Sequence, residues 1–202
     1  VSRRLFSWRR ATGVVALLAS LAAVCPAQAE PIRIASVFAK TGPGAEENSP
    51  NYRVVALAAK QVNAHGGLLG RPLEVVEFDT GSTVLGARQA AFDAVKAGVV
   101  AVVGPSWSSQ AMAMGPVFQE AGIPMIGPTT TAAEVTGIGD YIFRACYTDA
   151  SQARALARFA YEDLGARRAV VVTIAGDVYS EGLSDAFSQG FGALGGTVAT
   201  RT

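Results

Sequence analysis

The sequence contains few of the residues that hold metal ions or serve as catalytic bases and nucleophiles. It has one histidine, His65, and two cysteines, Cys25 and Cys146, in 202 residues. A zinc site needs three or four ligands from His, Cys and acidic side chains, and no Gly-x-Ser-x-Gly nucleophile elbow is present. A Ser–His–Asp site would require Ser108, His65 and Asp79 to converge in the fold. We therefore predict that the protein is not an enzyme and holds no metal.

Cofactor motifs are also scarce. The stretch Gly190-Phe-Gly-Ala-Leu-Gly195 matches the glycine pattern of dinucleotide-binding proteins. That pattern must follow a strand and open a helix, so that the pyrophosphate meets the helix N-terminus. Here it lies at the end of a predicted helix and precedes a predicted strand. We therefore expect no nucleotide cofactor.

Long hydrophobic runs are absent outside the N-terminal region. The apolar run at residues 11–24 is shorter than the roughly 20 residues that a membrane span requires. It follows four arginines without an acid and precedes Ala27-Gln28-Ala29, a small-x-small cleavage site. This layout is typical of a secretory signal peptide, so we predict a signal peptide at residues 1–29 and a periplasmic location. The N-terminus also fits a twin-arginine signal at Ser2–Phe6, so the export route stays open.

No large excess of charge points to a charged partner. Residues 1–29 hold four of the 17 basic residues and none of the 16 acidic ones, so residues 30–202 carry a formal charge of −3. A mildly acidic chain gives no electrostatic reason to expect nucleic acid as a partner. Once Cys25 is removed with the signal peptide, Cys146 is alone and no intrachain disulfide is possible.

The sequence does contain a regular alternation of apolar runs and segments with helical spacing. The wholly apolar run at residues 99–103 is typical of a parallel strand covered on both faces. The alternation predicts an α/β fold with a doubly wound parallel sheet, right-handed crossovers and ligands at the carboxyl ends of the strands. The predicted strands are residues 32–38, 73–78, 99–103, 123–126, 141–144, 169–174 and 197–200, and the predicted helices are residues 51–64, 83–97, 108–121, 150–163 and 180–194.

Hydroxyl-rich loops follow two of these strands. Ser106, Ser108 and Ser109 stand before or at the start of the helix at 108–121, and three threonines occupy residues 129–131. Free N–H groups at a helix start suit an anion such as a carboxylate, although a serine there can equally serve only as the N-cap. Because both loops meet the same edge of the sheet, we predict a ligand site there, with Ser108 and Ser109 as candidates.

Six motifs occur in the order and at the spacing of one known family. They resemble the type I periplasmic binding proteins of ABC transporters, in the leucine/isoleucine/valine-binding branch. The resemblance implies two α/β lobes that trap a small-molecule ligand, such as an amino acid, for delivery to membrane permease subunits. The motifs are Thr41-Gly42-Pro43, residues 63–72 (NAHGGLLGRP), Phe78-Asp79, residues 102–105 (VVGP), residues 121–128 (AGIPMIGP) and Phe143-Arg144.

The same resemblance assigns roles to individual residues. Ser108 matches the serine that holds the ligand's α-carboxylate through its hydroxyl and N–H, and Thr131 matches a threonine that contacts both carboxylate and amine. Thr129 stands where a backbone carbonyl receives the α-ammonium, and Tyr179 matches an aromatic residue that closes over the ligand. Glu47 stands where some members place a tyrosine against the ligand side chain. A carboxylate there puts branched-chain specificity in doubt.

Some family members have a disulfide between two positions that are Gly81 and Trp107 in this sequence. Neither residue is a cysteine, so that bond cannot form here. Trp107 could pack against the ligand or fill the core, and we predict the core.

The resemblance covers residues 31–202, and family members continue beyond that point. We expect a first ligand-binding lobe at residues 30–148, then a hinge and the truncated start of a second lobe at residues 149–202. The hinge rotation should fall near Tyr147–Ala150. We expect the second part to be weakly ordered and the short chain to be unable to close over a ligand. A ligand-sensing receptor module of the same fold, or a non-functional fragment, are the alternatives.

Overall fold

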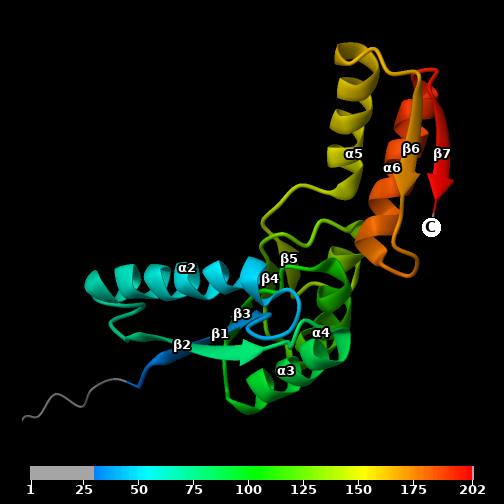
Figure 1. Ribbon diagram of the computed structural model, residues 1–202. Coiled ribbons are helices and arrows are strands. Elements are labelled where there is room, and N and C mark those ends of the chain that lie inside the picture. The colour runs from blue at the N-terminus through cyan, green and yellow to red at the C-terminus, as the bar shows by residue number, and fades with distance from the viewer. Residues whose placement is uncertain (1–29, 202) are drawn as a thin grey trace, which may run out of the picture. The chain divides into compact units, whose positions relative to one another are not determined.

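Five parallel strands build the sheet that underlies the predicted ligand site (Figure 1). The structure is a computed structural model that describes residues 30–201, and the predicted signal peptide lies outside the described residues. Residues 31–202 form one compact unit. The strand order is β2-β1-β3-β4-β5, and all neighbours are parallel, as predicted. The strands are β1 (Ile32–Phe38), β2 (Leu73–Asp79), β3 (Ala101–Val103), β4 (Met125–Gly127) and β5 (Ile142–Arg144).

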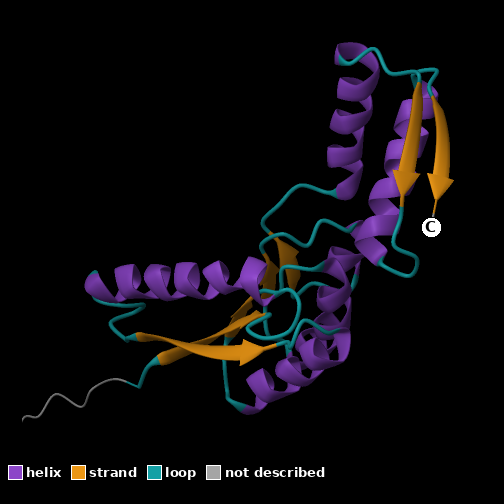
Figure 2. Ribbon diagram, viewed as in Figure 1, coloured by secondary structure: helices purple, strands orange, loops and turns teal. Residues whose placement is uncertain are grey.

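The helices between the strands lie on opposite faces of this sheet. The chain steps from β1 to β2 in one direction across the sheet, and from β2 to β3 and β4 in the other. Right-handed crossovers therefore place α2 (Ala45–Ala64) on one face and α3 (Val84–Lys96) and α4 (Ser108–Ala121) on the other (Figure 2). No helix of residues 30–201 combines the length and apolar character needed to cross a membrane.

The helix α2 begins at Ala45, six residues before the predicted start, and contains Pro50. A proline inside a helix leaves the carbonyl four residues earlier without its N–H partner. That carbonyl belongs to Glu46, and the Ser49 hydroxyl approaches it at 3.4 Å. The predicted boundary was wrong because contacts such as these, together with the bond from Asn48 Nδ2 to the Gly44 carbonyl at 3.0 Å, hold the turns before Pro50 in the helix. As a result, Glu47 stands on a helix rather than in a loop.

Small residues let α3 lie close to the sheet and to α4. The buried positions of α3 are Ala87, Ala90, Ala91 and Ala94, and all are at most 4% exposed. The larger core side chains come from the elements around it, chiefly Phe118 and Met114 of α4 and Met125 of β4. This division of large and small side chains brings the N-terminus of α4 to the carboxyl edge of the sheet.

The strands in the second half of the sheet are covered on one face only. Met125 and Ile142 are buried against the α3 and α4 side, while their neighbours Ile126 and Phe143 are 42% and 48% exposed. Val100, just before β3, is 55% exposed. The prediction that residues 99–103 are covered on both faces is wrong at Val100, because α2 packs over β1 and β2 and not over β3.

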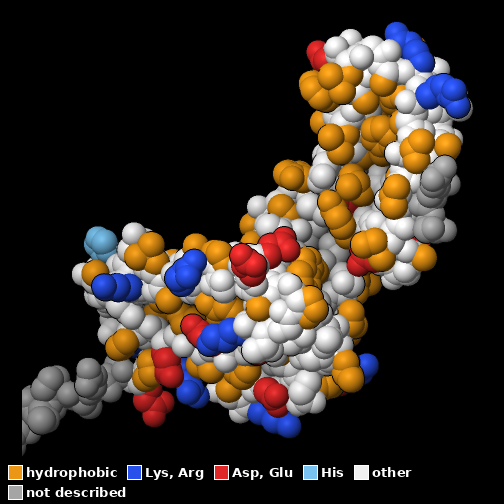
Figure 3. All heavy atoms as spheres, viewed as in Figure 1, with side chains coloured by type: hydrophobic (Ala, Val, Ile, Leu, Met, Phe, Trp, Pro, Cys, Tyr) orange, Lys and Arg blue, Asp and Glu red, His pale blue; other side chains and the backbone are white. Residues whose placement is uncertain are grey.

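A second, two-stranded parallel sheet follows, as the alternating pattern predicted. It pairs β6 (Arg168–Val172) with β7 (Thr197–Arg201), beside α6 (Val178–Ala193). The preceding helix α5 (Asp149–Arg158) continues into a π-helical turn and packs on α6. Val170 and Val172 are 63% and 77% exposed, and hydrophobic side chains show on the surface of this region (Figure 3). The lobe boundary at residue 149 and the weak order beyond it stay predictions.

Asp79, at the end of β2, ties together the loops that start α2 and α3. Its Oδ1 accepts the backbone N–H groups of Lys40 at 2.7 Å, Thr41 at 3.2 Å and Gly81 at 2.8 Å, and its Oδ2 accepts the Thr41 hydroxyl at 2.6 Å. Burial opposes ionisation, but these donors prevail and lower the pKa of Asp79 to about 2. The ionised carboxylate therefore fixes the loop that leads into α2.

Replacing Asp79 with Asn should destabilise the fold at neutral pH by about 1 kcal/mol, the scale of a lost charge-assisted hydrogen bond at an exposed site. Because the folded pKa lies below the ordinary value of 3.8, this stabilisation is present above pH 4 and is lost as the pH falls toward 2. Urea unfolding from pH 2 to 7 should show the difference between wild type and Asp79→Asn disappear at the acid end. Asp140→Asn, at an exposed carboxylate, is the control, and an unchanged difference at pH 2 would contradict the assignment.

Candidate functional site

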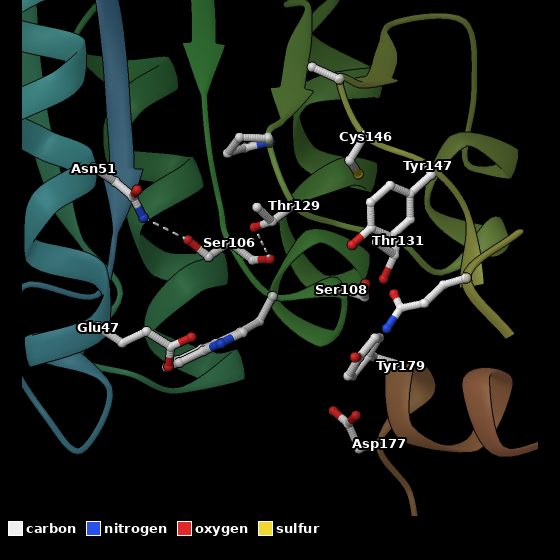
Figure 4. Close-up of a pocket in the computed structure, with 14 residues that line it drawn as sticks. Glu47, Asn51, Ser106, Ser108, Thr129, Thr131, Cys146, Tyr147, Asp177 and Tyr179 are labelled. Atoms are coloured by element: carbon white, nitrogen blue, oxygen red, sulfur yellow. Dashed lines mark hydrogen bonds between the residues drawn. The ribbon is translucent and has the colours of Figure 1, made fainter. Parts of the chain in front are cut away.

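A pocket of about 740 Å³ lies at the carboxyl ends of β3 and β4 (Figure 4). This is the edge at which doubly wound sheets bind ligands. Loops after both strands form its floor, and the starts of α2 and α6 and the segment after β5 form its sides. The lining residues are Glu47, Asn51, Ser106, Trp107, Ser108, Pro128, Thr129, Thr131, Ala145, Cys146, Tyr147, Gln152, Asp177 and Tyr179.

The hydroxyls of Ser108 and Thr131 meet at the N-terminus of α4. Ser108 is the first residue of α4 and is 3% exposed, and its Oγ accepts the Ala132 N–H at 3.2 Å. This bond leaves the Ser108 hydroxyl proton free to be donated. Thr131 is 7% exposed, and its hydroxyl makes no hydrogen bond to any described residue. Two buried hydroxyls from successive strand ends thus converge on one wall of the pocket.

The serines do not cap α4. Its N-cap residue is Trp107, which supplies no side-chain hydrogen bond to the first turn. The first backbone N–H groups of α4 therefore have no side-chain partner, and the positive end of the helix dipole remains available to an anion. The capping alternative for Ser106, Ser108 and Ser109 is wrong for this reason.

The remaining predicted site residues separate into two groups. Thr129, Tyr179 and Glu47 line the pocket, and the Thr129 hydroxyl donates to the Ser106 carbonyl at 2.8 Å. Ser109 does not line the pocket described here, because the next position along a helix turns about 100° away. The structure therefore brings Thr129, Tyr179 and Glu47 together in this pocket but not Ser109. Their roles toward a ligand stay predictions.

Trp107 is half-buried and lines the pocket, so its prediction as a core residue was wrong. Its ring lies directly against the backbone of Gly44, where an added Cβ would come within 1.9 Å of the ring atom Cη2. Gly44 is the N-cap residue of α2. The close approach that this glycine allows holds the indole at the edge of the pocket rather than in the core.

Arg144 supports the threonine loop from behind and was missed as a site residue. Its guanidinium donates to the carbonyls of Thr131 at 3.0 Å, Ala132 at 2.6 Å and Ala133 at 3.0 Å. It also donates to the hydroxyl of Thr136, in the 3₁₀ helix Ala133–Gly137 that the periodicity did not predict. Since Arg144 binds these carbonyls, the loop is fixed and its hydroxyls are left to face the pocket. Only the Phe143-Arg144 motif could have signalled this.

Asp149, the first residue of α5, lies buried beneath the threonine loop. It is 5% exposed, its backbone N–H donates to the Thr131 carbonyl at 3.0 Å, and neither carboxylate oxygen has a hydrogen-bond partner among the described residues. Burial raises the pKa of Asp149, and the nearby carboxylates of Glu134 and Asp177 add to the rise. The Thr131 hydroxyl is close enough to oppose the rise, although it lies outside hydrogen-bond geometry. A buried acid thus stands directly behind a pocket hydroxyl.

The lining also includes polar residues that sequence reasoning did not select. Asn51 stands one turn after Glu47 on α2, and its Nδ2 donates to the Ser106 hydroxyl at 3.0 Å. Tyr147 and Gln152 come from the connection after β5 and from α5. Asp177 caps α6 by accepting the Ser180 N–H at 2.8 Å. For these residues, the sequence offered only the four-residue spacing of Glu47 and Asn51, which places both on one face of a helix.

Comparison with known proteins identifies close relatives. Residues 31–202 match the family described as periplasmic binding protein. The leucine-specific-binding protein of Salmonella typhimurium is 31% identical over 90% of this chain and 49% of its own length, and the Leu/Ile/Val-binding protein of Escherichia coli K12 is 31% identical over 81% and 45%. The leucine binding protein LivK of Thermotoga maritima superposes with a TM-score of 0.78, at 34% identity over 84% of this chain and 48% of its own. The chain thus spans about half the length of these relatives.

Replacing Asp149 with Asn should change how stability depends on pH. Because the folded-state pKa is raised, the carboxyl contributes most to stability below the ordinary pKa, and this contribution is lost as the pH rises through the folded value. The Asp149→Asn variant should therefore gain stability relative to wild type as the pH rises from 4 to 7, as measured by urea unfolding. Asp185→Asn, on the exposed side of α6, controls for the loss of one negative charge. A constant difference across this range would refute the assignment.

Proposed function

Because the chain belongs to the periplasmic binding protein family, we propose that it captures an amino acid or a similar small polar molecule as the substrate-binding component of an ABC-type importer. The observation that carries the proposal is the convergence of the Ser108 and Thr131 hydroxyls with the uncapped N-terminus of α4 on one pocket. The relatives named above are binding proteins rather than enzymes, and the pocket-lining residues include no histidine.

The chemistry of this wall suits an α-carboxylate. The Ser108 hydroxyl has a proton to donate, and the Thr131 hydroxyl is buried without a partner, so a carboxylate oxygen would satisfy both. The free N–H groups of α4 add charge-assisted donors, which are about twice as strong as neutral ones. The α-ammonium would lie near the Thr129 carbonyl, and Tyr179 would cover the ligand from the α6 side.

The same proposal implies a location, partners and a closing motion for the protein. The signal peptide at residues 1–29 would deliver the protein to the periplasm, and its partners there would be the permease subunits of the importer. Lobe closure would turn on the connection near Tyr147–Ala150, which lies between β5 and α5. Rotation about such element ends is the usual means by which two-lobed binding proteins close.

In a protein extended to the full length of its relatives, Ser108→Ala should weaken amino-acid binding roughly 10- to 100-fold, since removing one partner from a buried charged hydrogen bond costs about 1–3 kcal/mol. Fluorescence of Trp107, which lines the pocket, and titration calorimetry can both report binding across a panel of the common amino acids. Ser109→Ala is the matched control, because Ser109 is the next residue on α4 but lies outside the pocket lining. Equal affinities for Ser108→Ala and Ser109→Ala would remove Ser108 from the site, and a panel without any binding would sink the proposal itself.

A further inference from the structure

The pocket has a second polar wall, made by Glu47, Asn51, Ser106 and Trp107, which the amino-acid-capture proposal leaves without a role. Glu47 and Asn51 stand one helical turn apart on α2, so both side chains project from the same face. They come from a different part of the chain than Ser108 and Thr131, and Figure 4 shows them on the other side of the pocket. This wall would face the side chain of an amino acid whose carboxylate is held at α4.

On this wall Glu47 and Asn51 offer acceptor oxygens, beside the Ser106 hydroxyl and the Trp107 Nε1–H, which can donate. The Asn51 amide nitrogen donates to the Ser106 hydroxyl at 3.0 Å, which leaves the Asn51 Oδ1 as a free acceptor. The Glu47 carboxylate is exposed, and no described residue donates a hydrogen bond or forms an ion pair with it. An apolar ligand side chain would displace the water that hydrogen-bonds to these oxygens and would offer no donor in its place. The loss of these hydrogen bonds costs free energy.

The charge of the pocket has one sign. Its lining includes two carboxylates, Glu47 and Asp177, and no lysine, arginine or histidine. Asp177 has one oxygen engaged at the start of α6, where it accepts the Ser180 N–H. Glu47 is therefore the carboxylate with the most unsatisfied hydrogen-bonding capacity in the pocket.

Trp107 adds an aromatic surface beside this carboxylate. The indole is held against Gly44, one turn before Glu47. Tryptophan is the side chain that attracts cations best through its ring face, and the attraction grows when the cation leaves water. A carboxylate, an amide oxygen and an indole at one end of a pocket are together suited to an organic cation that donates several hydrogen bonds.

We propose that this wall selects amino acids whose side chain ends in a guanidinium or ammonium group, in preference to leucine, isoleucine or valine. The inference rests on the proposed function, because it assumes that the α-carboxylate is held at Ser108 and Thr131. Glu47 pairs with the side-chain cation, Asn51 Oδ1 accepts one of its N–H groups, and Trp107 covers it. Specificity then arises at Glu47.

Arginine and its neutral isostere citrulline are the test pair. The protein should bind arginine at least about tenfold more tightly than citrulline or leucine, and the preference should weaken with added salt. Glu47→Gln should abolish the preference for arginine over citrulline while leaving citrulline affinity unchanged. Glu46→Gln is the matched control, because Glu46 shares the first turn of α2, and hence the same helix dipole, but does not line the pocket.

The outcomes separate this inference from the one on which it rests. Tighter binding of leucine than of arginine, or equal effects of Glu47→Gln and Glu46→Gln on arginine affinity, would overturn the assignment of Glu47 while leaving amino-acid capture intact. Weaker binding of arginine, citrulline and leucine alike in Ser108→Ala, with the preference for arginine retained, would support both. A protein that binds none of the three ligands would overturn both.

Discussion

Parallel pairing of β1 to β5 is the constraint on which the site depends. Parallel strands end at the same edge of a sheet, and each must be followed by a crossover helix whose N-terminus begins near that edge. The loops after β3 and β4 therefore meet there, although they are more than twenty residues apart in the chain. The close contact at Gly104, where a Cβ would lie 2.0 Å from the Val37 carbonyl, keeps the first loop against β1. The pocket is thus a consequence of topology before any side chain contributes.

Around the pocket, some polar groups have hydrogen-bond partners within the protein and others have none. Arg144 binds four successive carbonyls, those of residues 130–133, and Asp79 accepts three backbone N–H groups from the loops before α2 and α3. These clusters make the walls rigid. The Thr131 hydroxyl and the Asp149 carboxylate are left without hydrogen-bond partners beside the pocket. Because an unsatisfied buried group costs free energy, the place of the Thr131 hydroxyl on the pocket wall has a physical reason, as a bound ligand can satisfy it. Asp149 lies behind Thr131 and does not line the pocket.

The two ends of the pocket differ in chemical character. The α4 end offers donors, namely helix N–H groups and two hydroxyls, while the α2 end offers acceptors from Glu47 and Asn51. A zwitterion with a further positive group matches this polarity along its length. The relatives named above are leucine or Leu/Ile/Val binders by name, and the selectivity proposed for this chain depends on the α2 end. Specificity is a difference between affinities, and a single carboxylate on one wall is enough to change it.

Much of the architecture could be predicted from periodicity, because strand–helix alternation and glycine punctuation are local properties. The helix at residues 108–121 was predicted with its observed bounds, and Ser108, Thr129 and Thr131 were placed at the correct edge. Local sequence patterns did not predict the features that depend on contacts between residues far apart in the chain. The true start of α2, the displacement of Trp107 by Gly44, the support of the loop by Arg144 and the one-sided burial of β4 and β5 all depend on packing. The sequence by itself determined which elements form and in what order, since hydrophobic spacing sets them. Only the tertiary structure decided which side chains share a pocket, because that depends on which strand ends the parallel sheet brings together.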